Sequence, residues 1–360
     1  MRKAGIVGGR GDEARIAHTW LVSAPDTAEL VRRFRARASH LDRRLAAGSL
    51  AAAAWGGLQD SVPRGGVISL HARVQGVGPD AWEDASLAQI WFRGGADYIV
   101  PRADAGIFTL GSYPRDPERA APLERLADEI HRVTEGQVTP VGDVSRRLGH
   151  ERPITVRNSA VTGRVHIRWD ASNIWLIPVA RPDIDVEDAR RELARRFLHW
   201  LGPATKADLA RWTGTSPADA TVTWGAIEAE LAPVEVDGRP RFLLDADVDA
   251  FERAGPIRGC RLLPQDDPYT KLDHDLLVPD PTIRLMALPK VGASPGYIPG
   301  AVLVDGKVVG GWQRQGRKVT IHPFPGARIG AAAREAVERE ALTMPIAGPG
   351  APSVAWSGGA

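Results

Sequence analysis

The chain of 360 residues has a single cysteine, Cys260, and no apolar run long enough to cross a membrane. One cysteine excludes an internal disulfide framework and fits a reducing compartment. A membrane-spanning helix needs about 20 predominantly apolar residues. The first residues, MRKAGIVGGRGDEAR, also lack the apolar core of a signal peptide. We therefore expect a soluble, cytoplasmic protein without a membrane partner.

Lysine is scarce, because only six of the 46 basic residues are lysine, and the net charge is only +2. The protein as a whole is therefore not a polycation. Arginine suits bidentate contacts with phosphate and base edges, although a GC-rich genome explains the same bias. The segment Arg32–Arg44 carries six arginines against one aspartate. It predicts either a local phosphate-binding face or a solvated helix flank.

The fold class expected is α+β, with tandem winged-helix (helix-turn-helix) domains followed by a small antiparallel β-barrel. Residues 121–184 read as a helix, a short helix and a hairpin around "DASN". Residues 185–258 repeat the order with three helices, Ser216 as an N-cap and a hairpin at Asp237-Gly238. The expected units are a disordered leader at 1–15, an N-terminal winged-helix-like domain at 16–120, winged helices at 121–184 and 185–258, a barrel at 259–325, a helix at 326–345 and a disordered tail at 346–360.

The last helix of the third unit carries acidic side chains and neither lysine nor arginine between Ser216 and Leu231. Such a helix repels phosphate, so this unit is expected to be a scaffold. Its hairpin, with Arg239 and Arg241, is the one plausible DNA contact there.

The stretch "GGLQDSVPRGG", residues 56–66, interrupts an alanine-rich helical segment. Two glycines and a proline favour an extended backbone, in which residues two apart share one side. Gln59 and Ser61 are then expected on one side and Asp60 on the other. An amide and a hydroxyl can hold a water molecule but supply no base. The alternative is a domain joint with ordinary hydrogen bonds and caps.

Several stretches resemble a known family, the bacterial winged-helix DNA-binding proteins that include DNA glycosylases unhooking bulky alkylated or crosslinked bases. They are "LGPATKADLARWTG", "RLLPQDDPY", "VLVDGKVVGGWQR", "GGLQDSVPR", "LHARV" and "RGGADYIVPRAD", between Leu45 and Met344. The family's usual form has Gln-x-Gln or Gln-x-Asp, and then Arg-Gly-Thr with a histidine shortly after. Here Ser61 stands at the second motif position, Gly95 replaces the threonine, and Asp97 or Tyr98 lies near the histidine position.

The resemblance implies a monomeric protein that binds double-stranded DNA, nucleoid-associated when bound, and hydrolyses the N-glycosidic bond of alkylated purines without a metal or organic cofactor. Such hydrolysis must stabilise an oxocarbenium-like sugar and position a water. The expected catalytic residues are Gln59, Asp60 and Ser61. The expected DNA contacts are Arg64, Arg73, Arg93, Arg146, Arg147 and Arg157.

Two alternatives remain open at the level of sequence. The chain is a catalytically inactive DNA-binding member of the family, as the altered second motif position suggests. Otherwise it is a winged-helix transcription regulator that uses Arg146, Arg147 and Arg157, which predicts a dimer and a sequence preference.

Two weaker patterns are also present in the sequence. "DDPYTKLDHD" gathers Asp266, Asp267, Asp273, His274 and Asp275, which predicts either a metal site or a solvated loop. Trp55 and Trp91 flank the motifs, where each is expected either in the core or stacked on a displaced base.

Overall fold

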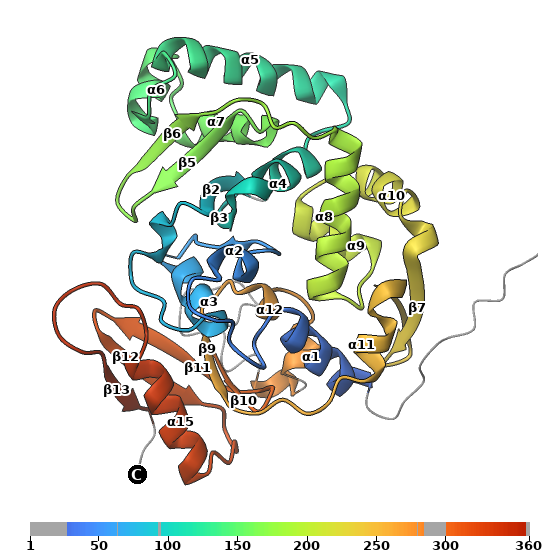
Figure 1. The fold of residues 1–360 in the computed structure, drawn as a ribbon, viewed down its shortest axis with the longest axis vertical. Helices are drawn as coiled ribbons and strands as arrows, with labels where there is room; N and C mark the ends of the chain where they lie inside the picture. The colour runs from blue at the N-terminus through green and yellow to red at the C-terminus, as the bar shows by residue number, and fades with distance from the viewer. Residues whose placement is uncertain (1–26, 63, 93–94, 279, 284–299, 358–360) are drawn as a thin grey trace, which may run out of the picture.

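The computed structural model describes residues 27–62, 64–92, 95–278, 280–283 and 300–357. The N-terminal elements form the first region, and the second, third and C-terminal regions surround it (Figure 1). A helical and β region lies at the top, a group of helices lies on the right, and a sheet with one long helix lies at the lower left. The expected leader at 1–15 lies outside the described residues. The mixed α+β class is confirmed.

A six-stranded sheet runs through the upper half of the molecule, with strand order β1-β3-β2-β5-β6-β4 and antiparallel pairs throughout. It joins the two expected units at 16–120 and 121–184, because β2 of the first pairs with β5 of the second. The strands are β1 (Leu58–Gln59), β2 (Leu87–Phe92), β3 (Ala96–Pro101), β4 (Thr139–Pro140), β5 (Val165–Trp169) and β6 (Ile174–Pro178).

The first region places four helices around β1–β3: α1 (Thr27–Ala38), α2 (Leu50–Ala53), α3 (Gly65–Arg73) and α4 (Ala105–Gly111). Strand β2 is buried along its whole length, as its apolar sequence LAQIWF favours. A core cluster runs from this strand to the third region, with Phe92, Phe108 and Phe197 fully buried.

The second region contains α5 (Pro117–Thr134), α6 (Val141–Arg147) and α7 (Pro153–Arg157), followed by the hairpin β5–β6. Helix α5 begins after Asp116, whose carboxylate accepts a hydrogen bond from the Glu118 amide, with Pro117 in the first turn. The expected helix, short helix and hairpin are present, with α7 as an additional short helix.

The third region contains α8 (Val186–Leu201), α9 (Lys206–Thr213), α10 (Pro217–Gly225) and the hairpin of β7 (Leu231–Val236) and β8 (Arg239–Leu244). Ser216 caps α10 as expected, since its hydroxyl accepts from the Asp219 amide. Asp237 and Gly238 have φ of 49° and 71°, as a two-residue turn between twisted strands requires. This hairpin and these three helices match the order predicted from sequence.

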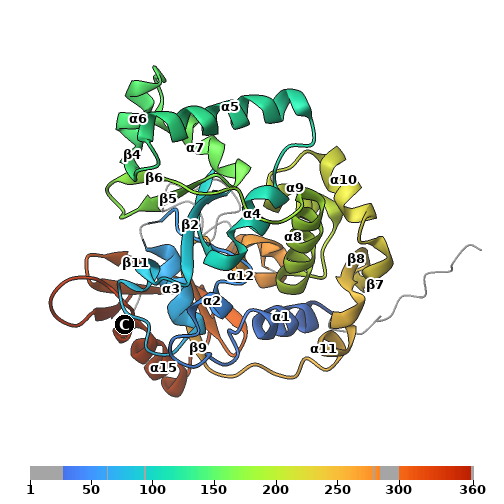
Figure 2. The ribbon, with the colours of Figure 1, turned by 45° about the horizontal axis from the view of Figure 1, so that its top comes forward.

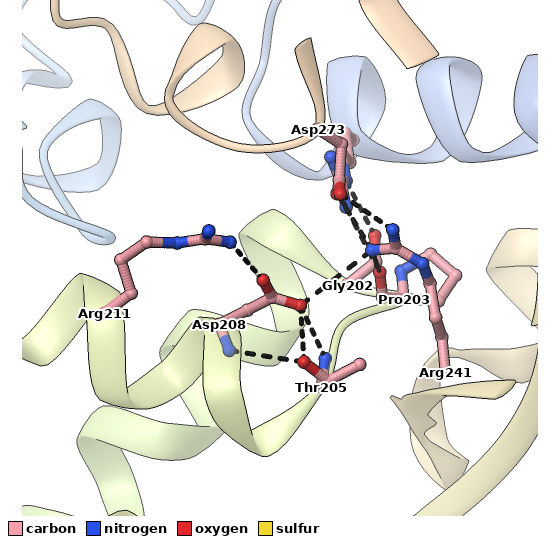
Figure 3. Close-up of polar contacts among 8 residues, drawn as sticks. Gly202, Pro203, Thr205, Asp208, Arg211, Arg241 and Asp273 are labelled. Atoms are coloured by element: carbon pink, nitrogen blue, oxygen red, sulfur yellow. Dashed lines mark hydrogen bonds and ion pairs between the residues drawn. The ribbon is translucent and has the colours of Figure 1, made fainter. Parts of the chain in front are cut away.

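The hairpin expected to contact DNA instead ties two distant segments together (Figure 3). Both Nη atoms of Arg241 donate to Asp273, at 3.0 and 2.8 Å. Asp208 lies 3.9 Å from the same guanidinium and completes the capping box of α9 with Thr205. Arg241 is therefore buried and paired inside the protein, so the expectation that it contacts DNA is wrong, whereas Arg239 of the same hairpin is exposed and its contact stays a prediction.

The remaining elements are α11 (Val248–Glu252), α12 (Pro268–Lys271), α13 (His274–Leu277), β9 (Cys260–Leu263), β10 (Gly300–Val304), β11 (Lys307–Gln315), β12 (Lys318–Pro323), α15 (Ala331–Leu342) and β13 (Ser353–Trp356). Helix α12 lies between α3 and α8 in both views (Figure 1 and Figure 2). This brings the "DDPYTK" segment beside the N-terminal motif.

Two expectations about the C-terminal region need correction. The strands form an open five-stranded sheet in the described residues, of order β13-β12-β11-β10-β9, whereas a barrel requires its outermost strands to pair. The tail at 346–360 was expected to be disordered, but it contributes β13, which pairs in parallel with β12. Val354 and Trp356 pack on the apolar cluster beneath this sheet, which composition alone conceals. In the part of the chain that the structure describes, helices long and apolar enough to cross a bilayer do not occur.

Candidate active site

Two glycines let the chain turn from α2 into β1. A Cβ on Gly56 would lie 2.3 Å from the Trp200 ring, so only glycine fits that approach. Gly57 has a φ of 80°, which other residues rarely adopt. The chain then enters β1, where Leu58 faces Ile99 and Gln59 faces Tyr98 of β3. The extended backbone predicted for the motif is confirmed.

Gln59 and Ser61 lie on one side of this segment, as predicted. The Gln59 Nε2 atom donates to Ser61 Oγ at 3.1 Å, and the Gln59 Oε1 atom accepts from the Tyr98 hydroxyl at 3.1 Å. Gln59 is buried and Ser61 is exposed. The pair therefore forms a fixed amide whose hydroxyl partner faces solvent.

Asp60 points away from that pair, into the protein. Its Oδ1 atom accepts from the Gly66 amide at 2.8 Å, and its Oδ2 atom accepts from Arg64 Nη1 at 3.1 Å and Gln89 Nε2 at 3.3 Å. Burial raises the pKa of Asp60 to about 7, against the opposing effects of the Gly66 amide and the Arg64 charge. Asp60 thus closes the turn into α3 through its hydrogen bonds with Gly66 and Arg64. Its carboxylate does not lie beside the side chains of Gln59 and Ser61.

A second buried carboxylate, Asp97, lies on the neighbouring strand β3, near the position where the resemblance leads us to expect histidine. Burial raises its pKa to about 6, and the charge of Arg157 partly opposes this. The nearest Arg157 nitrogen is 4.0 Å away, and the Asp97 Oδ1 atom has no hydrogen-bond partner. The Arg157 guanidinium also lies 3.9 Å from the Trp91 ring centre. Trp91 therefore lies in the core, one of its two expected placements, and Arg157 is mostly buried beside it.

Sequence analysis missed the residue that reaches Gln59 from the far end of the chain. The Lys271 ammonium donates to Gln59 Oε1 and, at 3.0 Å, to Asp266 Oδ1. A lysine ammonium has donors only, so it fixes which end of the amide faces it. The segment "DDPYTK" is the feature of the sequence that contains this lysine, but nothing in the sequence links it to a motif more than 200 residues away.

The expected phosphate contacts near the motif are mostly engaged inside the protein. Arg73 is fully buried, and its Nη atoms donate to both oxygens of Asp267 at 2.7 and 2.8 Å. Arg64 stacks 3.8 Å above the Trp82 ring while it binds Asp60. The expectation that Arg73 holds a phosphate is wrong, because its charge is neutralised in the core. Arg93 lies outside the described residues.

Three arginines of the segment Arg32–Arg44 likewise bind groups inside the protein. Arg35 is buried and donates to Asp273, Arg32 donates to the Leu276 carbonyl, and Arg44 binds Glu340. Three of its six arginines are therefore engaged inside the protein, whereas Arg37 and Arg43 are exposed, so phosphate binding by this segment stays a prediction. Forming these ties is what fixes α1 against the C-terminal half.

Arg146 and Arg147, by contrast, remain at the surface on α6. The side chain of Arg146 is 77% exposed and pairs with Asp143 at 3.0 Å. Arg147 is exposed and donates to the Val133 carbonyl. Of the five expected DNA contacts that the structure describes, these two are exposed.

The acidic segment 266–275 divides its carboxylates among separate cations. Asp266 binds Lys271, Asp267 binds Arg73, and Asp273 binds both Arg35 and Arg241. Groups of three or more His, Cys, Asp or Glu side chains that could hold a metal ion are absent among the described residues. The segment therefore cross-links the N-terminal and C-terminal halves and is not a solvated loop. Trp55, the other expected stacking residue, is partly buried under Arg196 at 4.7 Å.

The fold and the site define an α+β protein in which a buried amide, Gln59, is paired with an exposed hydroxyl, Ser61. A family model described as DNA glycosylase AlkZ-like matches residues 52–344, so the chain belongs to the AlkZ-like DNA glycosylase family. A curated relative, the interstrand DNA cross-link repair glycosylase of Streptomyces sahachiroi, is 30% identical over 146 residues. That match covers 39% of this chain and only 38% of the relative. The solved structure of Streptomyces sahachiroi DNA glycosylase AlkZ shares the fold, with a TM-score of 0.72 and 19% identity over 91% of this chain and 98% of that one.

Proposed function

We propose that this protein is a DNA glycosylase that hydrolyses the N-glycosidic bond of bulky alkylated purines in duplex DNA. The observation that carries the proposal is the fixed arrangement of Gln59 and Ser61, at the position where the family has its catalytic pair. Family membership and the curated relative's name support it. We further propose that the protein is monomeric and cytoplasmic, and that its second and third regions act as winged helices, supported by their helix and hairpin order.

Hydrolysis of this bond does not need a strong general acid. An N7-alkylated purine is cationic, so its nitrogen leaves with the bonding electrons as a neutral base. What remains is to position water and to stabilise the sugar cation. The buried Gln59 amide, fixed by Tyr98 and Ser61, is a preorganised group of that kind. We propose that Arg146 and Arg147 add phosphate contacts.

The direct test is release of free base from duplex DNA that carries one N7-methylguanine, under single-turnover conditions. The same duplex without the lesion is the control. Release from the lesion strand alone supports a glycosylase. A protein that binds the duplex with steep salt dependence and releases nothing would contradict the proposal.

One observation favours a second candidate, an inactive DNA-binding member of the family. Ser61 replaces the second amide or carboxylate of the motif, and its hydroxyl is not a base. The same assay separates the two candidates, because the inactive member binds and releases no base.

A further inference from the structure

Gln59 and Ser61, the two motif residues that lie on one side of the segment, do not supply a base. Water that attacks a sugar carbon must lose a proton, and neither an amide nor a hydroxyl takes it up at neutral pH. Asp60 is adjacent, but it is fully buried and both of its oxygens accept hydrogen bonds on the opposite side. A carboxylate that serves this site must come from another part of the chain.

Asp266 is the carboxylate that the fold brings there. Lys271 donates to Asp266 Oδ1 at 3.0 Å and also to Gln59 Oε1, so a single ammonium spans the two groups. Burial raises the pKa of the Tyr98 hydroxyl, and the negative charge of Asp266 raises it further, which places that charge close to the other partner of Gln59. The site thus contains an amide, a hydroxyl, an ammonium and a carboxylate.

The hydrogen bonds of Gln59 show why a carboxylate is needed. A carbonyl oxygen has two lone pairs, and Tyr98 and Lys271 both donate to Gln59 Oε1. This leaves the amide nitrogen, which already donates one proton to Ser61 Oγ, as the end that faces a reactant. Gln59 therefore donates to a water molecule and cannot accept its proton.

Two other carboxylates of the same segment, Asp267 and Asp273, are engaged by arginines. Asp267 is fully buried and binds Arg73 through both oxygens, and Asp273 is held by Arg35 and Arg241. Asp266 differs because its side chain retains 17% exposure and its ion pair with Lys271 is made through Oδ1, while Lys271 retains 33% exposure. The ion pair of Asp266 and Lys271 is therefore partly open to solvent.

Resting on the proposed function, we propose that Asp266 is the general base of the reaction and that Lys271 is its positioning residue. The bond between C1′ and the purine nitrogen breaks, and its electrons neutralise the cationic base. Water oxygen forms the new bond to C1′, and Asp266 takes the proton that this water loses. Asp266 thereby replaces the carboxylate or amide that Ser61 does not provide.

The test compares single-turnover base release by the wild type, Asp266→Asn and Asp266→Ala on duplex DNA with one N7-methylguanine. Asp275→Asn is the matched control, because that carboxylate lies on the same segment and is exposed. We expect both Asp266 variants to lose about 100-fold in rate or more, with unchanged affinity for the duplex. Added formate is expected to restore part of the rate of Asp266→Ala, because it fits the space of the missing carboxylate. A merely structural carboxylate shows no such rescue.

The outcomes separate this inference from the proposed function. Wild-type release with a fully active Asp266→Asn overturns the base assignment and leaves the glycosylase standing. Loss of rate in Asp266→Ala without rescue by formate overturns it as well. If the wild type binds but releases no base, both proposals fail. Circular dichroism melting of each variant shows whether lost rate reflects lost folding.

Discussion

The Lys271 ammonium donates a hydrogen bond to the Oε1 atom of Gln59, and this contact joins α12 to the strand that carries the sequence motif. Together with the Tyr98 hydroxyl it occupies Oε1, so under the proposed function the amide nitrogen is the end that meets the substrate. The site is consequently built from both halves of the chain, and the motif alone is an incomplete description of it.

Replacing Lys271 by methionine is expected to lower the single-turnover rate of base release by about 10²-fold, because a slightly misplaced reacting group costs that much. Affinity for lesion-free duplex is expected to stay the same, which a fluorescence-anisotropy titration measures. Lys271→Arg keeps a cationic donor and is expected to retain more of the rate. An unchanged rate in Lys271→Met would show that the contact has no role in orienting Gln59.

The buried pair of Arg73 and Asp267 is expected to support the fold and not DNA binding. Both side chains have no exposed surface, so removing one leaves an uncompensated charge in the core. We expect Arg73→Met to lower the free energy of unfolding by about 3–5 kcal/mol, measured by urea denaturation. Arg253→Ala, which breaks an exposed ion pair, is the control and is expected to leave the urea midpoint nearly unchanged.

The raised pKa of Asp97 predicts a loss of stability with rising pH. Its carboxyl titrates near 3.8 when unfolded and near 6 when folded, so the folded state binds more protons between these values. Stability therefore falls as pH rises from about 4 to about 6, and the penalty is complete above that range. Asp60, with a pKa of about 7, extends the same trend.

Asp97→Asn is expected to remove its share of this dependence. The difference between the variant's and the wild type's urea midpoints should grow in favour of the variant between pH 4 and pH 8. Comparison with the wild type is needed because burial lowers the pKa of His71 to about 4, which acts in the opposite direction at acid pH. A difference that is constant across this range would contradict the assignment.

The exposed arginines of α6 are expected to contact phosphate. The double variant Arg146→Ala, Arg147→Ala should weaken binding to all duplexes about equally and reduce the slope of log affinity against log salt by about 2. Titrations at four salt concentrations measure the slope. A control at Arg191, a partly exposed arginine of α8 paired with Asp188, tests whether any lost arginine has this effect. Equal slopes in the α6 variant and the wild type would remove these residues from the interface.

The sequence predicted the local features of the fold well and the long-range ones poorly. The Gly56-Gly57 break, the extended motif, the cap at Ser216 and the turn at Asp237-Gly238 follow from backbone preferences of neighbouring residues, and they are confirmed. A preference of that kind says nothing about which distant segment comes alongside.

The missed features all depend on such distant partners. The sequence predicts that Arg73 contacts phosphate, but in the structure Arg73 binds Asp267. The sequence predicts that Gln59 works with a neighbouring motif residue, but in the structure Lys271 also binds it. The glycines and prolines of the tail predict disorder, although four of its residues pair with β12. In each case the deciding energy lies in packing or charge pairing across the fold, which composition does not encode.

The central claim is that Gln59 works chemically in a protein whose second motif residue is altered. The most direct measurement is the single-turnover release of N7-methylguanine from duplex DNA by the wild type and by Gln59→Ala, with duplex affinity measured alongside. Gln137→Ala, an exposed amide on the second region, is the control. The account predicts a loss of about 100-fold or more in rate for Gln59→Ala, with unchanged affinity. Equal rates for Gln59→Ala and the wild type would contradict it.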